Sequence, residues 1–244
     1  KTNPSQIYRQ AGPITLSFFI KYQTLGGIIF EASDDGYVGN YSWKLSMPAV
    51  GQIGLLASTA GLSPIRYQRY SSEVLEVDKW THVIVTWDGI FNNDLDIYYN
   101  GKKTTIVVGP SDTGEGYGTL DRRPVNTLSM FSAYRQEFVL TSQCLSSSLA
   151  DVATWNCFME LPQAEELYHQ RDKGPLVSCR AGALLDYWRL GEEYTINGLN
   201  QEVVSGTMIP SYIGNNDVFS TGEVTASAGP YSKHRFKDVQ KFNN

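Results

Sequence analysis

Residues 77–89 read VDKWTHVIVTWDG, and residues 96–103 read DIYYNGKK. In the first segment Val83, Val85 and Trp87 recur at alternate positions, which is the period of a strand and not of a helix. The second segment alternates over fewer residues and ends in Asn100-Gly101, the strongest short hairpin signal. The two segments therefore predict antiparallel strands of one β-meander.

The same period recurs along the chain. Leu16, Phe18 and Ile20 share one face of a strand expected over 14–22, with polar residues on the other face, so we expect this strand to be covered on one side. Tyr41, Trp43, Leu45 and Met47 also share a face. Further strands are expected over 28–31, 41–47, 52–57, 103–108, 126–133, 149–158 and 184–192, and loops over 61–72 and 109–124.

A different pattern appears after residue 160. Pro162 stands in a first turn and Gly174-Pro175 follows, which predicts one short helix near 162–172. From 194 onward the alternation weakens and Gly, Ser, Thr and Asn become frequent. The chain thus divides into a sandwich over 1–193 and an irregular extension over 194–244. The basic end of this extension, Lys233 to Asn244, is expected to pack on the sandwich or to anchor it to a partner.

Composition narrows the functional classes. A chain of 244 residues with 12% aromatic residues and 22 glycines suits one large all-β domain. A net charge of −5 argues against nucleic acid as a partner, because phosphate binding needs clustered Lys and Arg. No apolar run approaches the roughly 20 residues that a membrane-spanning helix requires. Cys144, Cys157 and Cys179 form an odd set without metal-ligand spacing, and at most one pair can be oxidised.

Three separated segments resemble one known superfamily. The meander resembles the central hairpin of laminin-G-like proteins of the concanavalin A-like lectin/glucanase superfamily. Asp151 to Trp155, followed by Glu165 to Tyr168, is similar to the strand and helix of these proteins, and Leu184 to Glu192 resembles the strand that often follows. The resemblance implies an all-β fold, a two-sheet antiparallel jelly-roll sandwich of concanavalin A type, in a superfamily that mostly binds sugars.

Catalysis is not expected. The glucanase branch of the superfamily carries three acids alternating on one strand, and this sequence lacks that motif. The acids of 73–78 and the pair Asp94 and Asp96 are better interpreted as solvated faces, and no serine lies in a nucleophile-elbow context. His82 occupies the position of a structural histidine in the hairpin. A glycoside hydrolase would need carboxylates brought together from distant segments.

Calcium is the cofactor that the resemblance implies. Asp151 matches the aspartate that helps to hold a structural calcium ion in glucanase relatives. Asp34 and Asp35 form an acidic turn similar to the rim loops of calcium-dependent laminin G modules. A turn whose aspartates bond their own backbone explains this second pair equally simply, and we favour that interpretation.

Sugar binding by such sandwiches uses exposed aromatic rings beside polar side chains. Trp80, Trp87, Trp155 and Trp188 are assigned to the core, because each has a regular place in an alternating strand. Polar contacts could come from Asn40, Arg66 and Asn93. The candidate sugar-binding residues are Trp43, Arg66, Tyr67, Tyr70, Tyr98 and Tyr117.

These observations favour a non-catalytic binding module on a cell or virion surface. Its expected partner is a glycan or a protein, without membrane insertion, and pairing of an exposed sheet edge could make it a homo-oligomer or part of a larger assembly. The alternative is a structural protein of a virus particle, a capsid decoration or tail component, in which the jelly roll serves assembly and host-glycan adhesion. The residues from 195 to 244 favour this alternative, because a free-standing lectin does not need them.

Overall fold

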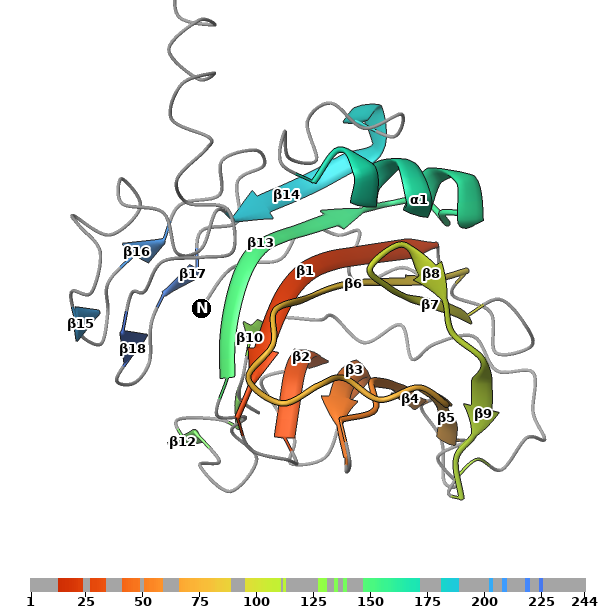
Figure 1. Ribbon diagram of the computed structural model, residues 1–244. Helices are drawn as coiled ribbons and strands as arrows, with labels where there is room; N and C mark the ends of the chain where they lie inside the picture. The colour runs from red at the N-terminus through yellow and green to blue at the C-terminus, as the bar shows by residue number, and fades with distance from the viewer. Residues whose placement is uncertain are drawn as a thin grey trace, which may run out of the picture.

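Two six-stranded antiparallel sheets face each other in the computed structural model (Figure 1). Sheet A has the strand order β14-β13-β1-β6-β7-β8, and sheet B has the order β10-β2-β3-β4-β5-β9. The predicted all-β jelly-roll sandwich is therefore confirmed. The structure describes residues 13–23, 27–33, 41–48, 51–58, 66–88, 95–110, 112, 127–130, 134–135, 138–139, 147–171, 181–188, 202–203, 208–209, 218–219 and 224–225.

The strands of the two sheets come from all parts of the chain between residues 14 and 188. Sheet A contains β1 (Ile14–Tyr22), β6 (Thr81–Trp87), β7 (Leu95–Tyr99), β8 (Lys102–Lys103), β13 (Ser147–Trp155) and β14 (Leu184–Trp188). Sheet B contains β2 (Gly27–Ser33), β3 (Tyr41–Met47), β4 (Gly54–Ser58), β5 (Arg66–Ser71), β9 (Ile106–Val108) and β10 (Thr127–Met130).

Short elements complete the description. One helix, α1, spans Leu161–His169, and a 3₁₀ turn spans Ala181–Ala183. Two-residue strands pair as β11 (Tyr134–Arg135) with β12 (Phe138–Val139), β15 (Glu202–Val203) with β18 (Val224–Thr225), and β16 (Met208–Ile209) with β17 (Val218–Phe219). The proposed division at residue 194 stays a prediction, because most of the extension, including Lys233 to Asn244, lies outside the described residues. None of the helices in the described part of the chain is long and apolar enough to cross a membrane.

The predicted meander is present as β6, β7 and β8. Asn100 and Gly101 both have positive φ, 51° and 78°, which is the conformation that a tight two-residue hairpin turn demands. The strand predicted over 103–108 is wrong as a single element. Thr104 is buried and bonds back to the Ile97 carbonyl, so the chain turns a corner, and Ile106 pairs with β5 in the other sheet.

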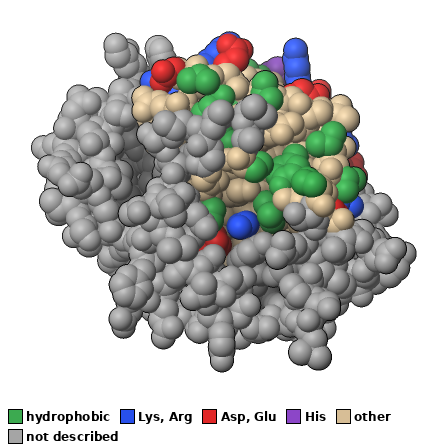
Figure 2. Space-filling view, turned by 90° about the horizontal axis from the view of Figure 1, so that it is seen from below, with side chains coloured by type: hydrophobic (Ala, Val, Ile, Leu, Met, Phe, Trp, Pro, Cys, Tyr) green, Lys and Arg blue, Asp and Glu red, His purple; other side chains and the backbone are tan. Residues whose placement is uncertain are grey.

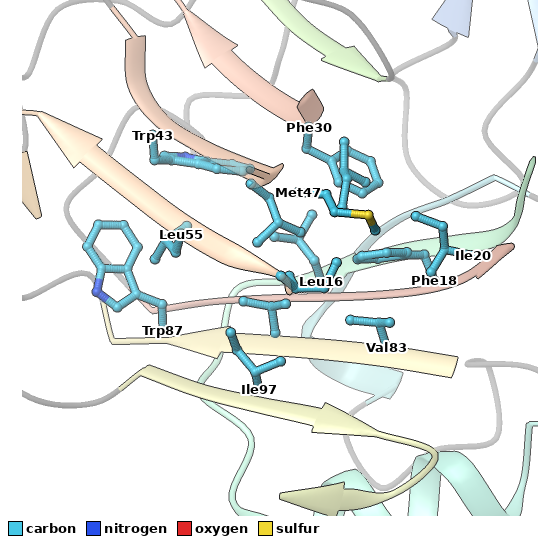
Figure 3. Packing of buried hydrophobic residues seen from close by; sticks show 14 of the residues in the cluster. Leu16, Phe18, Ile20, Phe30, Trp43, Met47, Leu55, Val83, Trp87 and Ile97 are labelled. Carbon is cyan, nitrogen blue, oxygen red and sulfur yellow. The ribbon is translucent and has the colours of Figure 1, made fainter. Parts of the chain in front are cut away.

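The core lies between the sheets (Figure 3). Phe18 of β1 meets Phe30 of β2 edge to face, with ring centroids 5.2 Å apart. The strand faces predicted from alternation are correct here, since Leu16 and Leu45 are also buried in this cluster. Burying each such side chain contributes about 1.5–3 kcal/mol. Trp87, Trp155 and Trp188 are buried as expected, whereas Trp80 is half-buried.

A second cluster covers the outer face of sheet A, where α1 packs across the strands (Figure 1). The prediction that β1 is covered on one side only is therefore wrong. Thr15 and Ser17, on the side away from the core, are also buried, and the Thr15 hydroxyl donates to the Cys157 carbonyl over 2.7 Å. The cluster contains Ile84, Tyr98, Ala153, Trp155, Met159, Ala164, Leu167 and Tyr187, with Cys157 packed against it.

The helix begins at Leu161, with Pro162 in its first turn as predicted. It ends at His169, earlier than the predicted end near 172. The Gln163 side-chain oxygen accepts the Glu160 backbone N–H over 2.8 Å, which satisfies a donor at the helix N-terminus. The Tyr168 ring stacks on His82 of β6, with centroids 5.8 Å apart. The helix is thus attached to the hairpin on which the fold prediction rests.

Residues 72–80 form a turn that closes one end of the sandwich between β5 and β6. Leu75 is buried, its N–H donates to the Gly51 carbonyl over 2.9 Å, and its carbonyl accepts the Tyr22 hydroxyl over 2.9 Å. The Glu73 carboxylate accepts the Thr105 N–H over 2.9 Å. Backbone and side-chain bonds therefore fasten this turn to β1 and to the segment before β9.

Replacing Gly101 by alanine should destabilise the fold. A Cβ atom at this position would lie 2.8 Å from the Tyr168 ring, in a backbone conformation that favours glycine. We expect a loss of about 1–3 kcal/mol, measured by denaturant unfolding. Gly182 is the matched control, because a Cβ atom there meets nothing within 4 Å. Equal effects of the two alanines would contradict the packing of Tyr168 over the hairpin turn.

The acid sensitivity of the fold should depend on Glu73. Partial burial raises the pKa of this carboxyl, but hydrogen bonds from Ser72 and Thr105 outweigh it, so the pKa lies below its ordinary value of 4.5. The carboxylate therefore contributes stability above pH 4.5, and this contribution is lost as the pH falls through the lower folded value. Glu73→Gln should lower the unfolding midpoint at pH 7, and the difference from wild type should shrink in acid. A constant difference would refute the linkage.

Candidate functional site

The two outer faces of the sandwich differ in chemistry. The outer face of sheet A is covered by α1 and its apolar cluster. The outer face of sheet B, seen from below in Figure 2, shows hydrophobic, basic and acidic side chains together on its described surface. Sheet B carries charged and amide side chains at outward positions of its strands, although Glu31 and Gln68 are buried there.

Four residues form a row across the strands of this face: Glu31, Lys44, Leu56 and Gln68. They lie opposite one another in the registers of β2, β3, β4 and β5. Each alternates with core residues on its own strand, so its side chain is on the outer side of the sheet. We call this set the cross-strand row.

The cross-strand row is charged and largely shielded from water. Glu31 is 0% exposed and Gln68 is 8% exposed, whereas Lys44 and Leu56 are half-buried. Glu31 and Lys44 face each other with opposite charges, an arrangement that stabilises paired strands by about 0.2–1 kcal/mol. The row thus offers a carboxylate and an ammonium group on adjacent strands and an amide beyond Leu56, which are acceptors and donors of hydrogen bonds.

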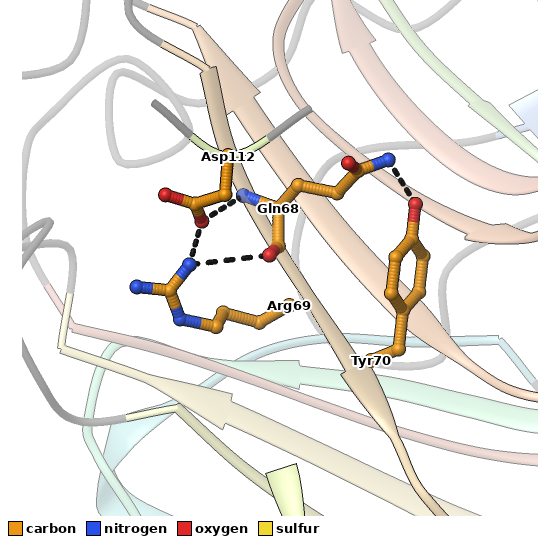
Figure 4. Close-up of polar contacts among 4 residues, drawn as sticks. All are labelled: Gln68, Arg69, Tyr70 and Asp112. Carbon is orange, nitrogen blue, oxygen red and sulfur yellow. Dashed lines mark hydrogen bonds and ion pairs between the residues drawn. The ribbon is translucent and has the colours of Figure 1, made fainter. Parts of the chain in front are cut away.

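Tyr70 lies beside this row on the same face. It pairs with Gly54, and its ring occupies the place that a Cβ atom on Gly54 would need. The Gln68 side-chain amide donates a hydrogen bond to the Tyr70 hydroxyl (Figure 4). The glycine thus lets the tyrosine ring lie close to the sheet, with its hydroxyl directed at Gln68.

A polar clamp fixes β5 at this position (Figure 4). The Asp112 carboxylate accepts the Gln68 backbone N–H over 2.8 Å and forms an ion pair with Arg69. The Gln68 carbonyl accepts the Gly109 N–H over 2.9 Å and the Arg69 guanidinium N–H over 3.2 Å. The Asp112 side chain is only 2% exposed, which strengthens its charged hydrogen bonds. The main chain of Gln68 is therefore held on both sides.

Most of the predicted sugar-binding rings are wrong as exposed stacking platforms. Trp43 and Tyr67 are 2% and 4% exposed and belong to the core, where the Tyr67 ring stacks on Trp87 with centroids 5.9 Å apart. Tyr98 is buried beneath α1 and donates to Asp96 over 3.0 Å. Strand alternation points the Trp43 and Tyr67 rings into the core, whereas Tyr98 lies on the opposite face of β7 from Leu95 and Ile97 and is covered there by the helix cluster.

The remaining predicted residues have three different outcomes. Tyr70 lies on the outer face of sheet B but is only 8% exposed, and its hydroxyl accepts the Gln68 side-chain amide. Arg66 begins β5, which corrects the loop predicted over 61–72, since residues 66–71 form a strand and the first five of them pair with β4. Tyr117, Asn40 and Asn93 lie outside the described residues, as do Asp34 and Asp35.

Asp151 is a bulge residue of β13. The register of β1 with β13 shifts between Ser17 and Phe19, and Asp151 adopts a φ of 50° at this point. Its Oδ1 atom accepts the Tyr187 hydroxyl over 2.9 Å. Calcium requires six to eight oxygen ligands, and no group of three or more acidic, His or Cys side chains suited to a metal occurs among the described residues. Among the described residues, Asp151 stands at the bulge of β13, and its side chain joins this strand to β14 through Tyr187.

Chelation tests the calcium prediction directly. If Asp151 holds calcium, a chelator should lower the melting temperature of the wild type by several degrees, and Asp151→Asn should abolish that difference. Tyr187→Phe is the control for the hydroxyl bond alone, since it leaves the carboxylate in place. A wild-type melting temperature that does not respond to chelator or added calcium would reject the prediction and leave Asp151 with its structural role.

One pair resembles a catalytic arrangement. Ser17 Oγ and His82 Nε2 are 2.8 Å apart, as in a nucleophile and its base. Both side chains are buried on the outer side of sheet A, and the rings of Phe19 and Tyr168 cover His82 from either side. In the structure this bond joins the buried side chains of β1 and β6.

The residues that sequence reasoning missed are Glu31, Lys44, Gln68 and Asp112. Each is separated from the others by at least ten residues in the chain, and only strand pairing brings them together. Two signals were present: polar residues at outward positions of strands whose other face is apolar, and the acids of the loop over 109–124, of which Asp112 is one of three. Neither reveals which strands are neighbours.

The architecture is that of a two-sheet jelly-roll sandwich with one helix packed on sheet A. Residues 2–148 match the family described as the concanavalin A-like lectin/glucanases superfamily, and the chain belongs to this superfamily. A comparison of the sequence with curated proteins finds no significant match.

Solved structures with the same fold include three carbohydrate-related or pentraxin proteins. The native heptameric SAP-like pentraxin from Limulus polyphemus has a TM-score of 0.58 and 14% identity, covering 96% of this chain and 88% of its own. A candidate carbohydrate-binding protein from Bacteroides ovatus has a TM-score of 0.55 and 16% identity, covering 90% of this chain and 54% of its own. The CBM40 of the Ruminococcus gnavus IT-sialidase, bound to α2,3-sialyllactose, has a TM-score of 0.50 and 12% identity, covering 66% and 84%. At these identities the likeness establishes the fold alone.

Proposed function

We propose that the chain is a non-catalytic binding module that recognises a carbohydrate through the outer face of sheet B. The observation that carries the proposal is the cross-strand row, in which Glu31, Lys44 and Gln68 stand in register on the face opposite the helix. Sugar hydroxyls donate and accept hydrogen bonds at once, and this row presents both kinds of partner on a rigid sheet.

Lys44 is the central contact of the proposed site. It is half-buried and therefore within reach of a ligand, and its register partner on β2, Glu31, is fully buried and carries the opposite charge. On the other side of Leu56, the amide of Gln68 and the hydroxyl of Tyr70 form a second polar pair. The Asp112 clamp keeps this pair in place, which limits the entropy that binding would cost.

The comparisons support this proposal by analogy of fold. One structural neighbour is described as a carbohydrate-binding module bound to a sialylated sugar, and another as a candidate carbohydrate-binding protein. Under this proposal the chain acts outside the cell or on a virion surface, where glycans are displayed. A protein partner at the same face, or a role in particle assembly, would take its place if no sugar binds.

A glycan array with the purified chain tests the proposal, with and without calcium. For any glycan that binds, Lys44→Gln and Tyr70→Phe should each weaken the affinity about 5–10-fold, because each removes one hydrogen-bonding group. Lys102→Gln on the exposed β8 is the matched control and should bind as wild type does. Binding that is unaffected by both site variants would exclude this face, and a blank array from the folded protein would reject carbohydrate recognition.

A further inference from the structure

Four exposed valines lie at one edge of sheet B. Val74 and Val77, in the turn over 72–80, are 54% and 58% exposed, and Val107 and Val108 on β9 are 38% and 66% exposed. The turn and β9 adjoin, since the Ser72 N–H donates to the Thr105 carbonyl over 2.7 Å. We call these four residues the valine patch. Among the described residues, Leu161 on α1 is the only other large apolar side chain as exposed.

Hydrogen bonds and a buried side chain fix the exposed valine patch in place. The turn bonds to β1 and to the segment before β4 through the Tyr22 hydroxyl and the Gly51 carbonyl, and Leu75 anchors it from inside. The other half of the patch is the outermost strand of sheet B in the described structure. Val107 and Val108 are successive residues of β9, so their side chains lie on opposite faces of this edge strand, and a segment that lies along the edge can contact both.

The charge beside the valine patch is negative. Glu73, Glu76 and Asp78 alternate with the two valines of the turn, and Lys79 is paired with Glu76 over 2.8 Å. The closest cation on β5, Arg69, is paired with Asp112. An occupant of this edge should therefore combine apolar side chains with positive charge.

The chain itself contains such a segment. Residues 233–242 read KHRFKDVQKF, with four Lys or Arg residues and one Asp, so this segment carries +3 while the rest of the chain carries −8 of the total −5. Phe236, Val239 and Phe242 supply three large apolar side chains at regular spacing. We propose that the valine patch is the docking site of this C-terminal segment, residues 233–242. This docking does not depend on sugar binding at the cross-strand row.

Covalent connection favours this occupant. A segment of the same chain meets the patch at a high effective concentration, so a small area of contact suffices for binding. Salt should weaken the contact, because the acids of the turn and the basic segment are exposed charges. Docking would also cover the free edge of β9 and so keep it from pairing with other chains.

Limited trypsin digestion of the full chain tests the proposal, with intact mass reporting cleavage at Lys233, Arg235, Lys237 and Lys241. Val74→Ser with Val77→Ser should speed this cleavage about tenfold, since the loss of two valine contacts raises the undocked population. Sodium chloride at high concentration should speed the cleavage of the wild type.

Leu161→Ser is the matched control and should leave the cleavage rate unchanged, and thermal melts should show that each variant is folded. If the double variant does not fold, Val108→Ser replaces it, because this side chain is the most exposed of the four.

Cleavage at one rate in wild type and patch variants would overturn the proposal. Protection that rises with protein concentration would show that the segment docks on a second copy of the chain, and the patch would still be its site. A fluorescent peptide of residues 233–244 should bind the full chain weakly and bind the double variant less, and equal binding to both would again exclude the patch.

Discussion

The position of β1 in the middle of sheet A constrains the rest of the sandwich. It pairs through seven consecutive residues with β6 and through most of its length with β13. In the sequence, β13 begins more than sixty residues after the start of β6. One face of β1 supplies the core, and the other carries small polar side chains beneath α1. Because those polar groups are shielded from water, their hydrogen bonds must be made within the protein. The bond between Ser17 and His82 is one of them.

This burial on both sides distinguishes sheet A from sheet B. Sheet A has no free face, because its helix fills the outer side with an apolar cluster. Sheet B has the opposite composition on its outer side, where Glu31 and Lys44 face each other in adjacent strands. This asymmetry of the two sheets is the basis for proposing sheet B as the recognition face. The clamp between Asp112 and β5 adds rigidity at the same place.

Alternation explains both the success and the failure of sequence reasoning about the site. The pattern around Trp43 correctly placed it on the same strand face as Leu45, and that face turned out to be the core. Aromatic content alone suggested sugar stacking, but a ring on the apolar face of a strand is buried by the opposite sheet. Tyr98 was misplaced for a second reason, since the helix that covers it joins the sheet from a distant part of the chain.

The sequence by itself determined the fold class, because period-two patterns, the Asn100-Gly101 turn and the helix after residue 160 are local properties of the chain. It also determined which strand faces are apolar. The tertiary structure alone decided which strands are neighbours, and therefore that Glu31, Lys44 and Gln68 form one row. It also decided that residues 103–108 divide between two sheets. The physical reason is that strand pairing joins backbone groups far apart in sequence, and no local pattern specifies the partner.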